Sequence, residues 1–291
     1  MKRAAWLFLV AGTLATAALL AACGNDDTSE GEAGAPTFAA GSAMARIASA
    51  GELTVGVKSD QPGFGLREAN GSYDGFDVAM GRAIGRALGL GEEQVRFVEV
   101  TSANRIGMLT EGKVDLVIAT MTITEARRQE IDFSRVYFRA GQSVLVQKAN
   151  TSIRAVGDLN GRKACSVTGS TSATTVRERA PQVDLLTLDT YGACVTALKD
   201  GRVEAVTTDD VILAGYAKAD ATLKLVGGTF TEEPYGIGVR KGQPELVAFV
   251  DGVIESMLEE GRWEGLYTEY LGGVEGVKPA TEARAAVEAG G

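Results

Sequence analysis

The sequence predicts an α/β protein built as two similar lobes, and two observations indicate this. Strand-like runs alternate with helical patterns along most of the 291 residues, which is typical of parallel sheets covered by helices. The chain also repeats itself: 109–122 and 198–211 share Leu, an acid, Gly, a cation, Val, an acid and a β-rich run. We therefore expect two related lobes whose strand ends face each other, where ligands of α/β proteins bind.

Three strands are expected in each lobe, and each repeat contains one of them. The glycine of each repeat, Gly112 or Gly201, is expected to end a short helix just before a strand. Apolar residues at helical spacing predict helices over 76–88 and 245–270. The expected strands are Glu52–Lys58, Val95–Val100, Val114–Ala119, Lys163–Thr168, Val183–Leu188 and Val203–Thr208.

The N-terminal residues predict export. A basic start, an apolar core to Leu20 and small residues before Cys23 form a secretory signal over 1–22. A cysteine directly after Ala-Ala resembles the bacterial lipobox, so we expect Cys23 to carry a lipid that holds the protein outside the cytoplasm on the cell membrane. The alternative is a transmembrane anchor, for which the apolar core is short. Residues 23–45 are expected to be a flexible tether, and 274–291 a small-residue tail.

Composition excludes several classes of function. A net charge of −9 argues against a nucleic-acid partner. The chain has no histidine, which removes Ser-His catalysis and histidine metal ligands, and no metal site or cofactor is predicted. In an exported chain, Cys165 and Cys194 are expected to form a disulfide, two free buried thiols being the alternative.

Polar residues gather just past the expected strand ends. In the first lobe Thr120 and Thr122 precede Arg127, which would lie on a short helix capped by Thr124. A guanidinium matches a carboxylate bidentately, and hydroxyls complete such a site. Taken alone, Arg127 could equally be a solvated helix residue.

Three further segments would face the same cleft. Ser170 and Thr171 open a helix whose free N–H groups suit an anion, although simple helix capping is the alternative. Asp209 ends the repeated strand of the second lobe and can hold an ammonium group, or cap a helix. Lys58 ends the first strand, where a surface lysine is the default.

Together these groups form sites for two anions and one cation. The segments that carry them resemble a known family. The chain is similar to the extracytoplasmic amino-acid-binding proteins of bacterial ABC importers, the polar amino-acid family (solute-binding family 3). The segments "GSYDGFDVAMGRAIGRALG", "GKVDLVIATMTITEARRQEIDFSRVY", "GSTSATT", "TTDDVILAGY" and "EPYGIGVRKG" carry the resemblance over roughly 51–273. "KSDQPGFG" and "DDVILAG" resemble its glutamate- and glutamate/aspartate-binding branch.

The resemblance implies a fold. It is the type II periplasmic-binding-protein-like α/β fold, with two lobes joined by two crossing strands. Lobe 1 would comprise 46–141 plus 234–273, and lobe 2 would comprise 147–228.

The resemblance also implies roles for single residues. Arg127 and Thr122 would hold the α-carboxylate of the ligand, with the amide and hydroxyl of Thr171 reaching it from the other lobe. Asp209 would bind the α-ammonium group, together with the carbonyl of Thr120.

Two positions bear on the ligand's side chain. Lys58 stands where relatives with neutral ligands often have an acid, so it would pair with a side-chain carboxylate. Phe64 would pack on the ligand, and Ser102 replaces a second aromatic residue found in many relatives.

The predicted function is a substrate-binding lipoprotein that captures L-glutamate, or aspartate, and delivers it to an ABC permease. The alternatives are a glutamine or other polar amino-acid binding protein, a dehydratase-like enzyme on the same fold, and a sensor domain.

Overall fold

The computed structural model describes residues 36–274 and 277–289 of the chain. The predicted signal 1–22, the lipidation site Cys23 and the tether up to residue 35 lie outside the described residues. The part from residue 36 onwards is one compact unit. In the residues described, no helix is both long and apolar enough to cross a bilayer.

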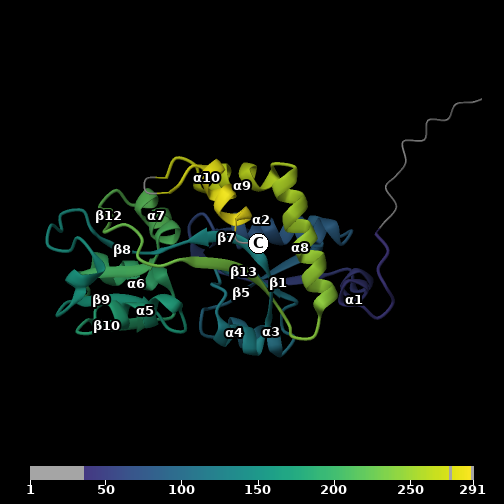
Figure 1. Cartoon of the computed structure of the whole chain (residues 1–291), viewed down its shortest axis with the longest axis horizontal. Coiled ribbons are helices and arrows are strands. Elements are labelled where there is room, and N and C mark those ends of the chain that lie inside the picture. The colour runs from purple at the N-terminus through teal and green to yellow at the C-terminus, as the bar shows by residue number, and fades with distance from the viewer. Residues whose placement is uncertain (1–35, 275–276, 290–291) are drawn as a thin grey trace, which may run out of the picture. The chain divides into compact units, whose positions relative to one another are not determined.

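The first five-stranded sheet has the order β5-β1-β6-β13-β7. β1 pairs in parallel with β5 and β6, whereas β13 runs antiparallel to β6 and β7. Figure 1 shows α2 and α8 beside this sheet. Its strands are β1 (Leu53–Val57), β5 (Val95–Glu99), β6 (Leu116–Val117), β7 (Asp132–Ala140) and β13 (Glu233–Val239), and its helices are α1 (Ala43–Ala50), α2 (Phe76–Ala87), α3 (Arg105–Thr110), α4 (Glu125–Glu130), α8 (Pro244–Glu259) and α9 (Arg262–Leu271).

The second five-stranded sheet has the order β10-β9-β11-β8-β12. Its strands are β8 (Gln142–Gln147), β9 (Lys163–Val167), β10 (Asp184–Leu188), β11 (Ala205–Asp209) and β12 (Leu223–Val226), and its helices are α5 (Thr171–Arg179), α6 (Tyr191–Lys199) and α7 (Asp210–Ala219). A three-stranded sheet of β2 (Asp60–Gln61), β3 (Gly65–Arg67) and β4 (Tyr73–Asp74) and two 3₁₀ turns, Glu92–Gln94 and Val156–Leu159, complete this part of the chain.

The chain crosses between the two sheets twice. It passes from β7 to β8 through Gly141 and returns from β12 to β13 through 227–232. The two crossings touch, because a Cβ at Gly141 would lie 2.6 Å from the carbonyl oxygen of Thr231. Two sheets of this kind confirm the predicted two-lobed α/β class, and we keep "lobe 1" and "lobe 2" for the parts carrying the first and second sheet. The residue boundaries of the lobes stay a prediction.

The internal repeat of the sequence is a repeat of structure. Gly112 after α3 and Gly201 after α6 both have φ of 71°, the left-handed conformation that glycine adopts without strain. The N–H of each glycine donates to the carbonyl three residues earlier, at 3.1 Å in both lobes. The helix-ending role predicted for both glycines is confirmed.

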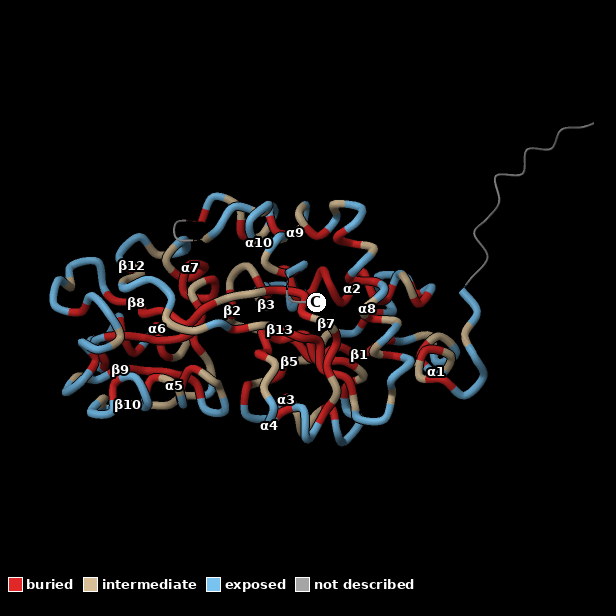
Figure 2. Tube along the Cα trace, viewed as in Figure 1, coloured by how far each residue is buried: buried red, intermediate tan, exposed pale blue. Residues whose placement is uncertain are grey.

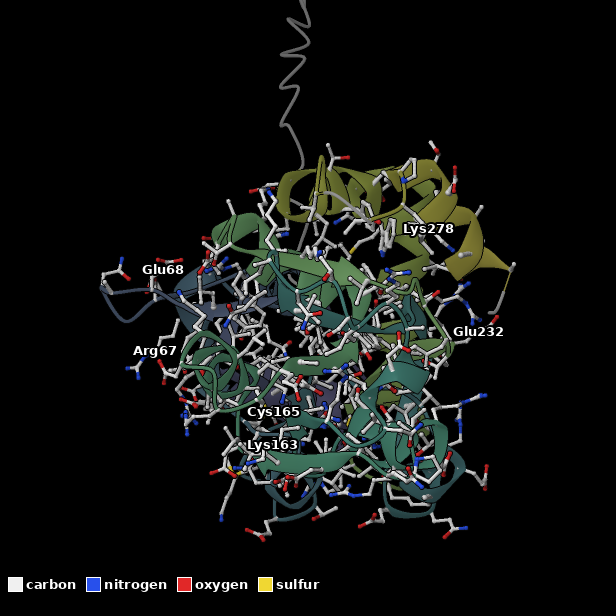
Figure 3. The ribbon with its side chains drawn as sticks, turned by 90° about the vertical axis from the view of Figure 1, so that its left-hand side faces the viewer. Arg67, Glu68, Lys163, Cys165, Glu232 and Lys278 are labelled. Atoms are coloured by element: carbon white, nitrogen blue, oxygen red, sulfur yellow. A yellow bond between two sulfur atoms is a disulfide. The ribbon has the colours of Figure 1, made fainter. Side chains whose placement is uncertain are left out.

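Cys165 on β9 and Cys194 on α6 form a disulfide, as predicted. Both residues are fully buried, and Figure 3 labels Cys165 on its strand beside Lys163. The bridge ties a central strand of lobe 2 to the helix that packs on it. Figure 2 shows the same organisation in both lobes, with buried strands inside and exposed loops outside.

Both ends of the described part differ from expectation. The predicted C-terminal tail contains α10 (Ala280–Glu288), which packs against β7 and α9 and buries Val287 completely. Its alanines favour a helix and allow close approach, a signal that a scan for apolar stripes misses. Within the predicted tether, the ring of Phe38 packs edge-on against Phe249 at 5.6 Å.

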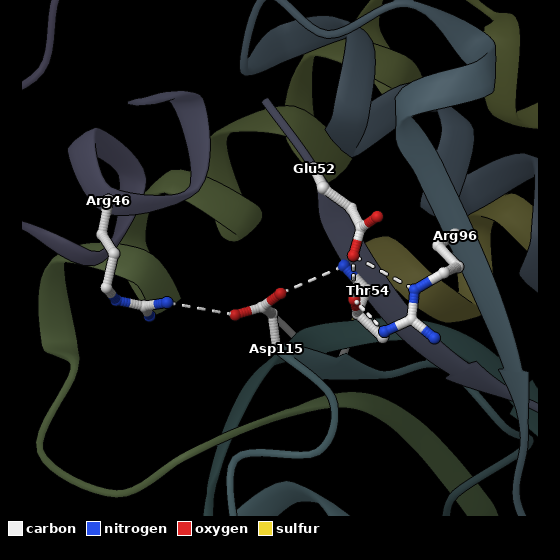
Figure 4. Close-up of polar contacts among 5 residues, drawn as sticks. All are labelled: Arg46, Glu52, Thr54, Arg96 and Asp115. Atoms are coloured by element: carbon white, nitrogen blue, oxygen red, sulfur yellow. Dashed lines mark hydrogen bonds and ion pairs between the residues drawn. The ribbon is translucent and has the colours of Figure 1, made fainter. Parts of the chain in front are cut away.

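A polar cluster fixes the N-terminal ends of the strands in lobe 1 (Figure 4). Asp115 accepts the backbone N–H of Thr54 at 3.0 Å and pairs with Arg46 of α1 at 3.3 Å. Glu52 accepts from the Arg96 guanidinium at 3.1 Å. Asp115 therefore joins β1, α1 and the approach to β6.

We expect Asp115→Ala to lower the free energy of unfolding by about 1–3 kcal/mol, because a backbone donor in the sheet loses a charged acceptor. Urea denaturation measures this change. Glu111→Ala, which removes an exposed ion pair with Lys113, is the control and should change the free energy of unfolding by less than about 0.5 kcal/mol. Equal effects of the two variants would contradict this role for Asp115.

Candidate functional site

Thr120 forms a strained bend just beyond β6. Its φ of 44° makes it the one non-glycine residue with left-handed backbone in the described part of the chain, a conformation that costs a β-branched residue about 1–3 kcal/mol. Asp77 accepts the N–H of Thr120 at 2.9 Å, and Tyr137 donates to the other oxygen of Asp77 at 2.7 Å. The hydroxyl of Thr120 donates to Gln61 at 3.0 Å. Buried side chains thus maintain a bend of the kind found at functional sites.

Arg127 reaches from lobe 1 to lobe 2. It lies on α4, where the hydroxyl of Thr124 accepts its N–H at 3.3 Å, as predicted for the helix cap. Its guanidinium donates to the carbonyl of Thr122 at 2.6 Å and to that of Gly169 in lobe 2 at 3.3 Å. Burial lowers the pKa of Arg127, and the nearby charge of Glu233 opposes this shift.

Glu233, which sequence reasoning missed, holds the two threonine hydroxyls expected at a ligand carboxylate. Thr122 and Thr171 donate to the same oxygen of Glu233 at 2.6 and 3.1 Å, and Thr231 donates to the other at 2.9 Å. A hydroxyl has one proton to donate. In this arrangement both hydroxyl protons therefore point to Glu233, and the expectation that Thr122 and Thr171 contact the ligand stays a prediction.

The backbone N–H groups of the same two threonines are the other donors at these positions. Thr122 faces Tyr235 in an antiparallel bridge whose hydrogen bonds come from the flanking residues Ile123 and Gly236, so the N–H of Thr122 lies outside that ladder. Thr171 is the first residue of α5, where N–H groups lack helical partners. Thr171 and Arg127 line one groove between α4 and α5.

Ser170 caps a helix, which is the alternative role considered for it. Its hydroxyl accepts the N–H of Ala173 at 3.1 Å and donates to the carbonyl of Val167 at 2.7 Å. Ser170 therefore orients α5, and with it the N–H of Thr171.

Asp209 ends β11 and is 4% exposed. It precedes α7 without a capping bond from its side chain. Its carboxylate accepts the hydroxyl of Tyr235 from lobe 1. Burial raises the pKa of Asp209 to about 8, and the charge of Glu233 acts in the same direction, whereas the Tyr235 bond opposes it. A ligand ammonium group would supply the positive charge that this carboxylate lacks.

Lys58 is buried beside a second cation that the sequence did not reveal. Its amine donates to Ser102 at 2.9 Å, and burial, followed by the charge of Arg105, lowers the pKa of Lys58 to about 7. Arg105 is 2% exposed; it donates to the carbonyl of Ala119 at 2.6 Å, and its Nε has no hydrogen-bond partner. Nothing in "SANRIG" distinguishes Arg105 from a solvated helix arginine.

A narrow polar cavity lies between the lobes. Phe64 does not line it: its ring is fully buried in lobe 1, 5.1 Å from Phe138 and 6.2 Å from Tyr235. The short β2–β3 turn carries Phe64 into the core, so we remove it from the expected ligand contacts. The cavity is lined by Ser102, Arg105, Thr120, Ser170, Thr171, Ser172, Tyr191, Thr208, Asp209 and Ile212.

The structure thus places most predicted site residues around one cleft. Thr120, Ser170, Thr171 and Asp209 line the cavity itself, and Arg127 lies in the adjoining groove. Lys58 lies behind Ser102. Within 36–274 and 277–289, no group of three acidic or cysteine side chains is arranged to hold a metal ion.

Comparison with known proteins gives consistent matches. An ABC transporter glutamine-binding protein, GlnH, of Bacillus subtilis (strain 168) is 41% identical over 255 residues, which is 87% of this chain and 92% of GlnH. The glutamate-binding protein GluB of Corynebacterium efficiens is 36% identical over 76% of this chain and 79% of its own.

A solved structure, an ancestral arginine-binding protein bound to glutamine, matches with a TM-score of 0.72 at 40% identity. The match covers 76% of this chain and 98% of that one, and it confirms the predicted periplasmic-binding-protein fold. The sequence model of the bacterial extracellular solute-binding proteins, family 3, matches residues 53–273. With most of its length matched in this way, the chain belongs to family 3 of the bacterial extracellular solute-binding proteins.

Proposed function

We propose that this protein captures L-glutamate between its lobes and delivers it to an ABC permease. One observation carries the choice of ligand: Lys58, Arg105 and Arg127 are at most 9% exposed. No salt bridge joins any of them to an acidic side chain in the described part of the chain. Because buried charges are costly unless paired, three such cations fit a ligand with more than one carboxylate.

Each charged group of glutamate has a counterpart in this arrangement. Arg127, with the N–H groups of Thr122 and Thr171, receives the α-carboxylate. Asp209 and the carbonyl of Thr120 receive the α-ammonium group. Lys58 and Arg105 receive the side-chain carboxylate. At about 1.5–3 kcal/mol for each charge-assisted bond, these contacts are sufficient for the roughly 8 kcal/mol of a micromolar complex.

Glutamine is the second candidate, and similarity favours it. GlnH exceeds GluB in identity to this chain, and a matching solved structure holds glutamine. A side-chain amide would accept hydrogen bonds from Lys58 or Arg105 through its oxygen, but it would leave their charges uncompensated. The charge of the ligand's side chain is therefore the property that separates the two candidates.

Transport would follow from lobe closure. The ligand docks on Arg127 of lobe 1, and Thr171 and Asp209 of lobe 2 then complete its shell, so that binding favours the closed state. The permease would recognise that closed form. The protein performs no chemistry in this scheme, and amino acid recovered after incubation should be unchanged; a consistent product would favour the enzyme alternative.

Arg127→Ala should weaken the binding of glutamate and glutamine alike by at least about a hundredfold, because both ligands share the α-carboxylate. Isothermal titration calorimetry measures both affinities. Arg128→Ala is the matched control, since Arg128 is exposed and packs on Phe133, and it should bind both ligands normally. Binding by Arg127→Ala at wild-type affinity would remove Arg127 from the site.

Lys58→Met should weaken glutamate binding about tenfold or more while changing glutamine binding by less than about threefold, because only glutamate loses an ionic partner. Calorimetry with both ligands gives the ratio of affinities. Equal losses would exclude Lys58 from recognition of the side chain.

The ratio of the glutamate affinity to the glutamine affinity should depend on pH. In the ligand-free protein the pKa of Lys58 is lowered to about 7. A bound carboxylate favours the charged form of Lys58. Above pH 7, glutamate binding is therefore accompanied by uptake of a proton. The glutamate-to-glutamine affinity ratio should then fall as pH rises above 7, by up to about tenfold per unit. Asp209, with a pKa of about 8, is proposed to face the ammonium group that both ligands share, so its titration cancels in the ratio. Asp77, with a pKa of about 7, favours the charged form of Lys58 as it ionises, which makes the fall less steep without reversing it. A ratio that is constant from pH 6.5 to 9 would contradict this role for Lys58.

We also propose that Cys23 carries the lipid that anchors the protein. Wild-type protein should fractionate with membranes and incorporate labelled fatty acid, whereas Cys23→Ser should do neither and still bind ligand. Label in the Cys23→Ser variant would place the lipid elsewhere.

A further inference from the structure

Outside the ligand cavity, a short segment of lobe 1 makes hydrogen bonds with two helices of lobe 2. Asp60 accepts the N–H of Gly192, in the first turn of α6, at 2.8 Å. Tyr216 of α7 donates its hydroxyl to the backbone carbonyl of Asp60 and lies 3.2 Å from its carboxylate. One acidic residue of lobe 1 therefore contacts both helices.

The two lobes also approach at backbone distance here. A Cβ at Gly215 of α7 would lie 2.3 Å from the carbonyl oxygen of Pro62, closer than real atoms come. A Cβ at Gly192 would lie 3.6 Å from the Cβ of Asp60. Glycine at position 215 is thus required for this contact and not for the helix, in which alanine is the better helix former.

This contact is joined to the ligand site without being part of it. The cavity is lined by Tyr191 and Ile212, which lie on α6 and α7, but not by Gly192, Gly215 or Tyr216. On the other side, the segment begins two residues after Lys58 and includes Gln61, which accepts the hydroxyl of Thr120. Closing the contact therefore brings both halves of the cavity together.

We infer that residues 60–62, packed against Gly192, Gly215 and Tyr216, form a clasp that closes the two lobes. The contacts of Gly192, Gly215 and Tyr216 add the same increment of affinity to every ligand, because none of these three residues lines the cavity. This inference rests on the proposed binding function only for the choice of glutamate and glutamine as probes.

Gly215→Ala tests the clasp. The added methyl group meets a backbone carbonyl only in the closed form, so the dissociation constants of glutamate and glutamine should both rise at least tenfold with their ratio unchanged. The thermal midpoint without ligand should stay the same or rise. Gly252→Ala in α8 is the matched control, because nothing lies within 4 Å of its added Cβ. Affinities equal to those of Gly252→Ala, or a changed ligand ratio, would overturn the clasp.

Tyr216→Phe is a gentler variant that keeps the ring and removes the hydroxyl. It should weaken both ligands by the same factor, about two- to tenfold, through a faster dissociation rate. Tyr270→Phe, which removes an exposed hydroxyl bonded to Asp74 at 2.9 Å, should leave the affinities unchanged. Selective loss of one ligand would assign Tyr216 to ligand recognition instead.

A cross-link tests the contact without relying on either ligand. The Cβ separation of 3.6 Å suits a disulfide, so Asp60→Cys combined with Gly192→Cys should oxidise to a 60–192 bridge, identified by peptide mapping apart from Cys165–Cys194. Adding Gly215→Ala should slow its formation at least tenfold. If wild-type protein binds neither glutamate nor glutamine while this bridge forms in the double-cysteine variant, the proposed ligands are wrong and the clasp stands. Failure of the bridge to form would overturn the clasp even if both ligands bind.

Discussion

The site depends on the double crossing of the chain between its two sheets. Gly141 and Thr231 hold the two crossings in close contact, so the lobes are joined along one line. Glu233 begins β13 directly after one crossing and bonds to Thr122 of lobe 1 and Thr171 of lobe 2. The connection that joins the lobes thus also sets the distance between their binding groups. In the proposed scheme, closure of the lobes about this line would be driven by a ligand in the cleft.

Buried charges that have no ionic partner in the described part of the chain would provide the driving force for closure of the lobes on a ligand. Lys58, Arg105 and Arg127 lie away from water, and burial lowers the pKa of each. Burial has the opposite effect on Asp209, whose pKa rises. Both kinds of shift mean that the charged form is destabilised without a partner. A zwitterion with an extra carboxylate would relieve all of them together, and closure would strengthen each interaction by removing water.

Local features of the fold could be predicted because short sequence patterns encode them. Gly112 and Gly201 end helices through a conformation that glycine favours, and Thr124 caps α4 through its own hydroxyl. Arg105 and Glu233 could not be predicted in this way. Their neighbours in space, such as Ala119 and Thr122, are distant in sequence, so each looks like a solvated charge until the fold is known. The position of the Phe64 ring could not be predicted for the same reason, because only the β2–β3 turn determines which way the ring points.

Selectivity and closure are physically separate in this arrangement. The groups proposed for the common parts of an amino acid, Arg127 and Asp209, lie on different lobes from each other, and their bonds to Gly169 and Tyr235 cross between the lobes. The groups proposed for the side chain, Lys58 and Arg105, both belong to lobe 1 and bond within it, to Ser102 and to the carbonyl of Ala119. Under these proposed roles, a substitution at Lys58 would change which side chain is accepted while the bonds between the lobes persist. The clasp at Asp60 extends this separation, because it adds contacts between lobes where no ligand atom is needed.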